Sequence, residues 1–371
     1  MAAAIFWLGI AIPVYTYAGY PLLLVLLRGL INRSVSKRDI EPLVTFLIPA
    51  YNEARCIVRK IRNTQELDYP ASKLEIVVAS DGSKDATAEL AQSMADGERV
   101  QVFAYPQNRG KIAVLNDSVP RARGEIVVFS DAAAFLPADA LRKLLRNFGD
   151  PSVGAVSGKY AVVRPDDVST GKSEDFYWKY ETFLKVKESE LSSTLGGHGH
   201  LHAIRKDLYP FPPPGTINDD YIIPVSVLAK GYRAVYEPGA LVYEEAVEMT
   251  GFGRRVRIMA GNVQQIREIK GLLRPLQPLP VFFFLSHKVA RLVVPFAMVA
   301  ALIANLFLLR SPFYLFLFAA QAICYALALA GIRESLKPKI LMLPFYFSMV
   351  NAATFFGIYH ALTSRRRMSW K

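Results

Sequence analysis

Long uncharged apolar runs at both ends of the chain, with a charged region between them, limit its fold more than any other feature. Residues 1–27 contain no Asp, Glu, Lys or Arg, and residues 292–309, 311–332 and 340–362 are three more such runs. A helix needs about 20 apolar residues to cross a bilayer. We therefore expect an N-terminal transmembrane helix within residues 1–30 and about three C-terminal transmembrane helices within residues 289–371. The first run lacks the basic start of a cleavable signal peptide.

The distribution of basic residues predicts the orientation. A formal net charge of +12 suits either a nucleic-acid-binding protein or the inner face of a membrane protein. Arg28, Arg33 and Lys37 directly follow the first run, whereas the residues before it are uncharged. By the positive-inside rule, residues 40–270 face the cytoplasm at an inner or plasma membrane. Because no nucleic-acid-binding motif accompanies the charge, we expect membrane lipids and no nucleic acid as partners.

The C-terminal tail conflicts with a count of four spans. Arg365, Arg366, Arg367 and Lys371 follow the last run, and four spans would place them outside, where the rule disfavours them. Either the last run is re-entrant or interfacial, or the rule fails here. Residues 271–288 contain three prolines and a Phe cluster, and their longest apolar stretch is too short to cross a bilayer. We therefore expect an interfacial segment there.

The region between the spans predicts a doubly wound α/β domain. Short apolar runs at 43–49, 76–79, 100–104 and 126–129 alternate with helical patterns at 53–67, 85–94 and 112–119. Such runs suit parallel strands buried on both faces. Polar residues follow each run, at the carboxyl strand ends where α/β sheets bind ligands. Helix capping is the alternative explanation for any one of them. Neither a glycine-rich dinucleotide fingerprint nor a phosphate-loop motif is present.

These polar clusters resemble the motifs of the family 2 glycosyltransferases. Residues 46–53, Phe-Leu-Ile-Pro-Ala-Tyr-Asn-Glu, resemble the family's opening, and residues 78–87, 109–116 and 130–133 resemble its next three motifs. Asn218-Asp219-Asp220 resembles its TED motif and is followed by the usual Gly-Tyr-Arg at 231–233. The similarity runs in order over residues 43–261. With the flanking spans, it resembles the membrane-embedded branch that includes the cellulose, chitin, hyaluronan and poly-N-acetylglucosamine synthases.

The resemblance implies a GT-A fold, a nucleotide-sugar donor with uridine favoured, and inversion at the anomeric carbon. It also implies a glycan or lipid-linked acceptor and a role in cell-surface or extracellular polysaccharide synthesis. Asp220 matches the catalytic base, and Asp219 is its electrostatic partner. The nucleotide-sugar-binding residues implied by the motifs are Glu53, Asp81, Lys111, Asp131, Arg254 and Arg257.

Two departures from the family pattern qualify the expectation. Ala133 stands where the final metal-binding Asp of the DxD-type motif is usual, so we expect Mg²⁺ or Mn²⁺ with Asp131 as the protein ligand. Ile258 stands where processive synthases carry the Trp that stacks on the acceptor, which weakens the case for a long polymer. The aromatics at 177, 178 and 180 offer a substitute platform, although core packing is their commoner use.

Other features of the chain leave alternatives open. The glycine-rich stretch 196–200 lets the backbone approach a sugar, and its two histidines are too few to predict a metal site. A polyprenyl-phosphate glycosyltransferase shares the N-terminal motifs. An inactive partner subunit of a polysaccharide export complex would explain Ala133 and Ile258. Three or four spans make a small channel, which predicts an export partner or a homo-oligomer if a polymer crosses.

Overall fold

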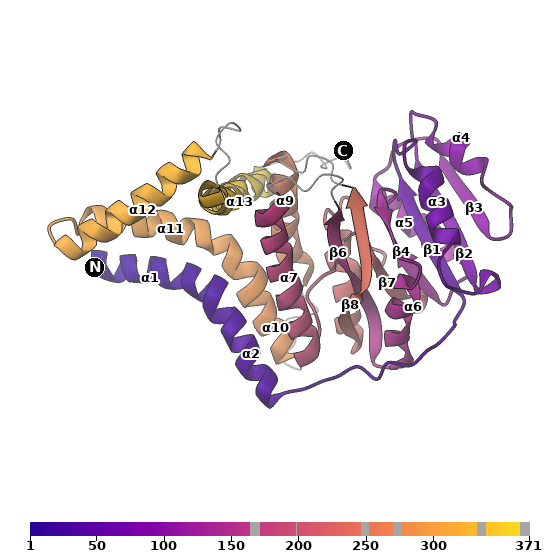
Figure 1. The fold of residues 1–371 in the computed structure, drawn as a ribbon, viewed down its shortest axis with the longest axis horizontal. Helices are drawn as coiled ribbons and strands as arrows, with labels where there is room; N and C mark the ends of the chain where they lie inside the picture. The colour runs from indigo at the N-terminus through magenta and orange to yellow at the C-terminus, as the bar shows by residue number, and fades with distance from the viewer. Residues whose placement is uncertain (164–170, 198, 246–251, 270–276, 332–338, 364–371) are drawn as a thin grey trace.

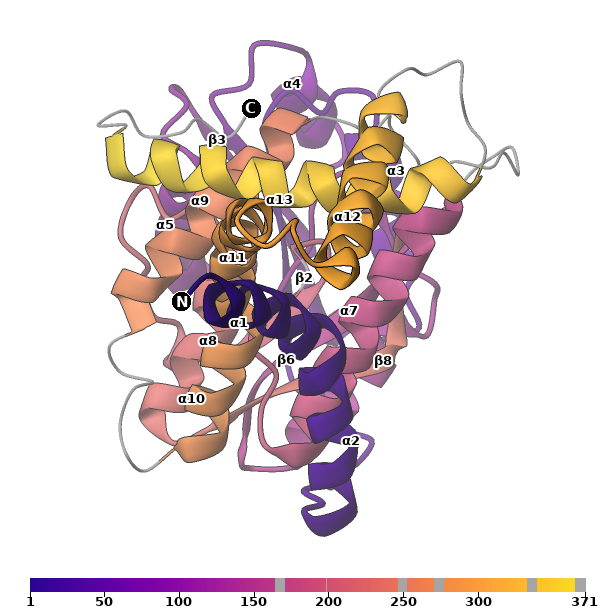
Figure 2. The same ribbon diagram turned by 90° about the vertical axis from the view of Figure 1, so that its left-hand side faces the viewer.

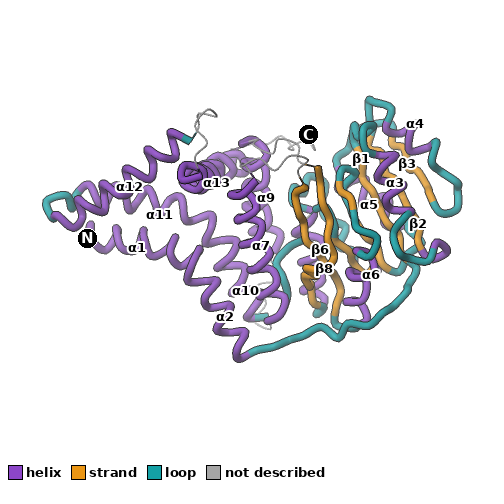
Figure 3. The backbone as a smooth tube through the Cα atoms, in the orientation of Figure 1, coloured by secondary structure: helices purple, strands orange, loops and turns teal. Residues whose placement is uncertain are grey.

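The computed structural model describes residues 1–371 except 164–170, 198, 246–251, 270–276, 332–338 and 364–371. Figure 1 shows a sheet domain at one end of the long axis and long helices at the other, with α7 and α9 between them. The extended segment 31–43 runs from the helical region to the far part of the sheet domain (Figure 3). The predicted site residues lie in the sheet domain, apart from Arg254 and Arg257 on the helix Phe252–Glu268 (α9).

The described part of the chain forms one eight-stranded sheet in the order β3-β2-β1-β4-β7-β6-β8-β5. The strands are β1 Val44–Ala50, β2 Leu74–Asp81, β3 Val100–Tyr105, β4 Ile126–Phe129, β5 Ala134–Phe135, β6 Val153–Val163, β7 His202–Arg205 and β8 Arg233–Glu245. Strands β1 to β4 are parallel, which confirms the doubly wound half predicted from the four apolar runs. β7 runs antiparallel to β4 and β6, so the sheet is mixed.

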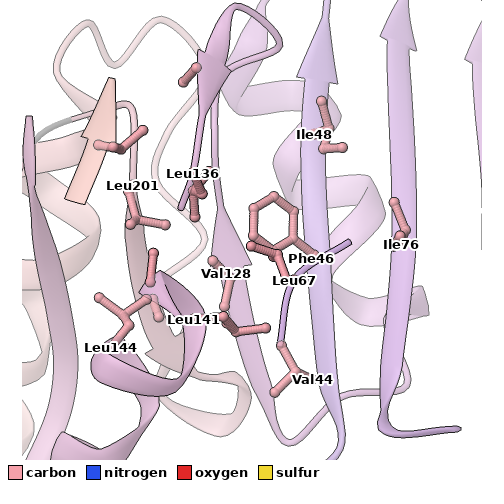
Figure 4. Close-up of a cluster of buried hydrophobic side chains, with 14 of the residues drawn as sticks. Val44, Phe46, Ile48, Leu67, Ile76, Val128, Leu136, Leu141, Leu144 and Leu201 are labelled. Carbon is pink, nitrogen blue, oxygen red and sulfur yellow. The ribbon is translucent and has the colours of Figure 1, made fainter. Parts of the chain in front are cut away.

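Helices cover the sheet and build its core. They are α3 Ile57–Gln65, α4 Thr87–Gln92, α5 Lys111–Arg121, α6 Ala140–Leu145, α7 Gly171–Leu191, α8 Asp219–Ser226 and α9 Phe252–Glu268. Short 3₁₀ turns occupy Ala71–Lys73, Arg146–Gly149, Lys206–Leu208 and Val227–Lys230. Figure 4 shows Phe46, Ile48 and Val128 from the sheet packed against Leu141 and Leu144 of α6. Because these strands are buried on both faces, their sequences are nearly continuous apolar runs.

The helix expected from residue 53 begins instead at Ile57. The Glu53 amide donates to Thr87 Oγ1 at 2.8 Å, and the Ala54 amide donates to Asp85 Oδ2 at 3.2 Å. Asn52 has a positive φ of 57°, which turns the chain sharply after β1. These bonds to the loop after β2 replace a first helical turn and hold Glu53 at the carboxyl edge of the sheet.

Three helices are long and apolar enough to cross a membrane, among the described residues: Ala2–Leu30, Pro278–Leu306 and Pro312–Ala330. The first joins α1 Ala2–Val14 and α2 Tyr20–Leu30 through a π-helical turn at Tyr15–Gly19. The second joins α10 Pro278–Phe283 and α11 Ala290–Leu306 through another at Phe284–Val289. Proline removes a helical hydrogen bond, so a wider turn near Pro13 and Pro21 fits the bend between α1 and α2 in Figure 1.

Two C-terminal regions bear on the expected spans. Residues 278–288 continue directly into α11, residues 271–276 lie outside the described part, and an interfacial position for 271–288 stays a prediction. The apolar run 340–362 forms α13 Lys339–Thr363, after α12 Pro312–Ala330. α13 is seen end-on in Figure 1 and lengthwise in Figure 2, so it runs across the direction of α11 and α12.

Candidate active site

Asp81 ends β2 and organises the loop that opens α5. Its side chain is fully buried. Its Oδ1 accepts the Arg109 amide and its Oδ2 accepts the Gly110 amide, both at 2.8 Å. Asp81 therefore fixes the start of the helix that carries Lys111. Contact with the nucleoside stays a prediction for this residue.

Lys111 joins three elements that are distant in sequence. Its Nζ lies 2.9 Å from Asp131 Oδ1, after β4, and 2.9 Å from Asp219 Oδ2, at the start of α8. Burial disfavours the charged lysine, but the two carboxylates outweigh it and raise the pKa of Lys111 above its usual value. A permanent cation therefore sits between the DxD-type motif and the TED-like motif.

The two candidate carboxylates Asp131 and Asp220 differ in electrostatics. Burial raises the pKa of Asp220, and the charge of Asp219 raises it further, against the opposing effect of nearby lysines. For Asp131, burial also acts to raise the pKa, but Lys111 outweighs it and the net shift is downward. Asp131 thus stays ionised, while Asp220 holds a proton more readily. A carboxylate with a raised pKa suits a proton acceptor.

The glycine-rich loop lies between these carboxylates. A Cβ on Gly199 would stand 3.6 Å from Asp131 Oδ2 and 3.9 Å from Asp220 Oδ2. The Gly197 amide donates to the Asp220 carbonyl at 2.7 Å, and a Cβ there would meet Ser157 Oγ at 2.2 Å. The loop therefore sets the backbone of Asp220 and leaves space between the two carboxyl groups. Gly197 is therefore required for close packing against the Ser157 side chain, and approach of the loop to a sugar stays a prediction.

His200, the described histidine of this loop, contacts protein side chains. His200 Nε2 lies 3.2 Å from Glu244 Oε2, and its ring stacks on Tyr160 at 4.2 Å. His198 lies outside the described part. Among the residues searched, no group of three His, Cys, Asp or Glu side chains could hold a metal ion. Asp131 remains the single predicted protein ligand.

The remaining predicted residues lie around this centre. Glu53 is half-buried and accepts a hydrogen bond from Cys56 Sγ at 3.3 Å. Arg257 lies on α9. The side-chain amide of Asn218 donates to the Ile258 carbonyl of that helix at 3.3 Å. This bond ties α9 to the residue before Asp219. The side chain of Arg254 is outside the described part.

Two buried lysines support the site and were not predicted. Lys60 Nζ donates to Ser130 Oγ at 2.8 Å and to the Ala134 carbonyl, so it anchors the loop that carries Asp131. Lys185 Nζ donates to the Gly197 carbonyl at 2.6 Å. Lys60 interrupts the apolar face of α3, with Ile57 and Ile61 beside it, which is a signal that could have found it. Lys185 lies among acidic residues of α7, a pattern that resembles a solvated face.

The aromatic residues of α7 divide between the sheet and the membrane-like helices. The Trp178 ring lies edge-on to Tyr160 at 5.0 Å, beside His200. The Tyr180 hydroxyl donates to the carbonyls of Thr16 and Tyr17, so this ring faces the first long helix. The side chain of Tyr177 is outside the described part. Of the two described rings, Trp178 is the one beside His200, and a role in acceptor binding stays a prediction.

A buried polar cluster joins α7 to the long helices. Glu188 accepts hydrogen bonds from the Tyr20 hydroxyl at 2.7 Å and shares one with His287 Nδ1 at 2.6 Å. His287 Nε2 lies 3.4 Å from Glu181, which also pairs with Arg291. These contacts attach α7, the helix that carries Lys185, to the long helices.

Comparison with known proteins agrees with the geometry. Residues 45–210 match the family described as Glycosyl transferase family 2. Poly-beta-1,6-N-acetyl-D-glucosamine synthase of Staphylococcus aureus (strain COL) is 29% identical over 231 residues, covering 59% of this chain and 54% of that protein. N-acetylglucosaminyltransferase of Rhizobium sp. (strain N33) is 25% identical over 217 residues, covering 55% and 48%. The chain thus spans about half the length of the curated relatives it matches.

One solved structure is similar over the whole length. The mannosyltransferase PcManGT from Pyrobaculum calidifontis, in complex with GDP-Man and Mn²⁺, has a TM-score of 0.74 and 26% identity, covering 98% of this chain and 100% of that one. The mixed sheet therefore has the GT-A fold that the resemblance implied. Residues 45–210 therefore match the family 2 glycosyltransferases, and the chain is similar to proteins named poly-beta-1,6-N-acetyl-D-glucosamine synthase, N-acetylglucosaminyltransferase and mannosyltransferase.

Proposed function

We propose that the protein is a membrane-bound inverting glycosyltransferase. It moves a sugar from a nucleotide-sugar donor to a glycan or lipid-linked acceptor, in cell-surface or extracellular polysaccharide synthesis. The observation that carries the proposal is the cluster in which Lys111 bridges Asp131 and Asp219, with Asp220 beside them. The three apolar helices and the basic residues after the first one support a domain on the cytoplasmic face of an inner or plasma membrane.

In this reaction the acceptor hydroxyl oxygen attacks the anomeric carbon, and the bond to the donor diphosphate breaks on the opposite face. Asp220 takes the hydroxyl proton, for which its raised pKa suits it. The nucleoside diphosphate leaves with the electron pair of the broken bond. Lys111 supplies a cation near the developing negative charge, and Arg257 of α9 is the second candidate. Glu53 and Asp81 are proposed to contact the nucleoside.

Asp131 is the residue of this cluster that we propose as the protein ligand of a divalent metal. Asp131 Oδ2 faces the space beside Gly199, while its Oδ1 is held by Lys111. Mg²⁺ is often bound by one or two carboxylates with substrate phosphates completing the shell. We therefore propose that Asp131 and the donor phosphates would hold Mg²⁺ or Mn²⁺, which when bound would offset charge on the leaving diphosphate. The Mn²⁺ in the PcManGT complex supports this choice.

Uridine and guanosine are the two candidate nucleosides of the donor. The sequence motifs favour a UDP-sugar, whereas PcManGT was solved with GDP-Man. A polyprenyl-phosphate acceptor is the second candidate for the lipid-linked case. The inactive-subunit alternative draws on Ala133 and Ile258, but the intact cluster of Lys111 with Asp131 and Asp219 favours turnover. An export partner or a homo-oligomer would complete a channel if the product is a polymer.

The test is release of nucleoside diphosphate by the protein in nanodiscs. A panel of UDP- and GDP-sugars is supplied with Mg²⁺ or Mn²⁺ to wild type, Asp220→Asn and Asp207→Asn. Asp207 is an exposed acidic residue away from the cluster and serves as the matched control. We expect release from one donor class that Asp220→Asn abolishes and Asp207→Asn preserves. Release that survives Asp220→Asn would remove the assigned base, and no binding of any donor would favour the inactive subunit.

A further inference from the structure

We propose that α13 lies along the cytoplasmic surface of the membrane and does not cross it. Its exposed aromatic and aliphatic face then contacts lipid, and the basic tail stays on the same side as the catalytic domain. The proposal concerns the topology of the chain and does not depend on the sugar or the acceptor. It decides between the alternatives that the apolar run 340–362 leaves open.

The direction of α13 is the first observation. In Figure 1, α1, α11 and α12 extend lengthwise toward one end of the molecule, and α13 is seen end-on. In Figure 2, α13 lies lengthwise across the view while α11 is seen nearly end-on. The helices that meet the length and hydropathy needed for a span include α11 and α12. A helix that runs across such spans lies parallel to the bilayer surface.

One side of α13 is closely packed on α9, the last helix of the sheet domain. A Cβ on Gly357 would meet Met259 Cβ at 2.5 Å and the Val256 carbonyl oxygen at 2.9 Å. The Arg255 guanidinium lies 4.5 Å from the centre of the Tyr346 ring. α13 is therefore in contact with a polar, charged helix along its length, which a helix in the bilayer interior would avoid.

Another side of α13 contacts the long helices. Phe347 packs edge-on against Tyr17 at 5.4 Å, and Phe355 packs edge-on against Phe296 at 4.7 Å. Tyr17 belongs to the π-helical turn between α1 and α2, close to the buried polar cluster of α7. These contacts place α13 at the level where the membrane-like helices meet the sheet domain. That level corresponds to the interface between lipid and water.

A third side of α13 is exposed and apolar. Phe356, Tyr359 and Leu362 are 53%, 64% and 65% exposed and are spaced three residues apart, so they share one face. Phe252 of α9 packs edge-on against Phe356 at 5.5 Å and is itself 38% exposed, which extends the patch. Aromatic side chains concentrate at membrane interfaces. The exposed face that carries Phe356, Tyr359 and Leu362 is therefore the side of α13 that we expect to enter lipid, while the side that packs on α9 stays against protein.

Charge favours lipid over a second copy of the chain as the occupant. The sequence after α13 contains Arg365, Arg366, Arg367 and Lys371. Basic residues beside a membrane helix are attracted to the anionic lipids of the cytoplasmic leaflet. With three spans, the tail returns to the side of Arg28, and the conflict with the positive-inside rule disappears. A fourth span would place four basic residues outside.

Cysteine labelling in sealed vesicles tests the side of the tail. In a background with Cys56→Ala and Cys324→Ala, single variants Ser34→Cys, Ser311→Cys and Ser369→Cys are treated with a membrane-impermeant maleimide, with and without detergent. Ser34 marks the side of the catalytic domain, and Ser311, between α11 and α12, marks the other side. We expect the protected fraction of Ser369→Cys to equal that of Ser34→Cys. Equality with Ser311→Cys would overturn the proposal.

Depth measurement tests the position of the helix itself. Spin labels at Phe356→Cys, Tyr359→Cys and Leu362→Cys cover six residues, or about 9 Å along a helix. In a flat helix the three depths stay shallow and differ only because the label direction turns by about 60° from one position to the next, whereas a spanning helix adds a steady change of about 1.5 Å per residue. Phe313→Cys and Ile323→Cys, exposed positions on α12, are the spanning controls. A stepwise change along α13, or labels hidden from both lipid and water probes by another copy, would contradict lipid contact.

Discussion

Replacement of Gly197 by alanine should damage catalysis more than its small volume suggests. The added Cβ would stand 2.2 Å from Ser157 Oγ, 2.9 Å from Ser157 Cβ and 3.3 Å from the Asp220 carbonyl oxygen. Ser157 is fully buried in β6. The loop has little room to move because Gly197 donates to the Asp220 carbonyl and accepts from Lys185 Nζ. The clash must therefore be relieved by displacing the backbone that carries the proposed base.

The expected magnitude follows from these contacts. Overpacking a tight interior costs about 1–3 kcal/mol, and loss of the bond to Asp220 adds about 1 kcal/mol. A displacement of about 1 Å at a catalytic group lowers turnover by about 100-fold. We expect a lower melting temperature in detergent and a kcat for nucleoside diphosphate release that falls by about that factor.

The matched control and a compensating change make the test specific. Gly253 on α9 has nothing within 4 Å of its added Cβ, so Gly253→Ala should leave kcat unchanged. The Ser157 hydroxyl makes no hydrogen bond within the described part of the chain. Adding Ser157→Gly to Gly197→Ala removes both close contacts and should restore part of the lost kcat. A wild-type kcat for Gly197→Ala would refute the reasoning.

Three further substitutions test the charges around the site. Lys111→Met leaves Asp131 and Asp219 without their shared cation. We expect the free energy of unfolding to fall by an amount toward the lower end of about 3–5 kcal/mol, because Asp131 is partly exposed. Calorimetry should also show weaker binding of the donor. Lys185→Met removes a positive charge that lowers the pKa of Asp220, so the acid limb of the kcat profile should move to higher pH, and Lys185→Arg should restore it. Burial lowers the pKa of Lys60 to about 7, from an ordinary value of 10.5. The contribution of the Lys60 amine to folding stability is present above pH 10.5 and is lost as the pH falls through about 7. The melting temperature of Lys60→Met relative to wild type should therefore rise as the pH is lowered from 10 to 7. A pH-independent difference between the two melting temperatures would contradict the assignment.

Much of the fold could be predicted from local patterns in the sequence. The apolar runs ending at Pro49, Ala79 and Phe129 became buried parallel strands because a strand covered on both faces needs apolar side chains at every position. The motif residues fell at the carboxyl strand ends because parallel topology brings those ends to one edge. The N-terminal span followed from length and the absence of charge alone.

Other features depend on contacts between residues distant in sequence. Lys111 meets Asp131 and Asp219 only because the end of β4 and the start of α8 lie beside the start of α5, and no spacing in the chain encodes that meeting. Glu53 lies outside its expected helix because its backbone amide donates to the Thr87 side chain and the next amide, of Ala54, donates to the Asp85 side chain. The direction of α13 is of the same kind. Hydropathy records how apolar a helix is, but whether it crosses other helices or runs beside them is decided by the surfaces it packs against, here α9 on one side and the long helices on another.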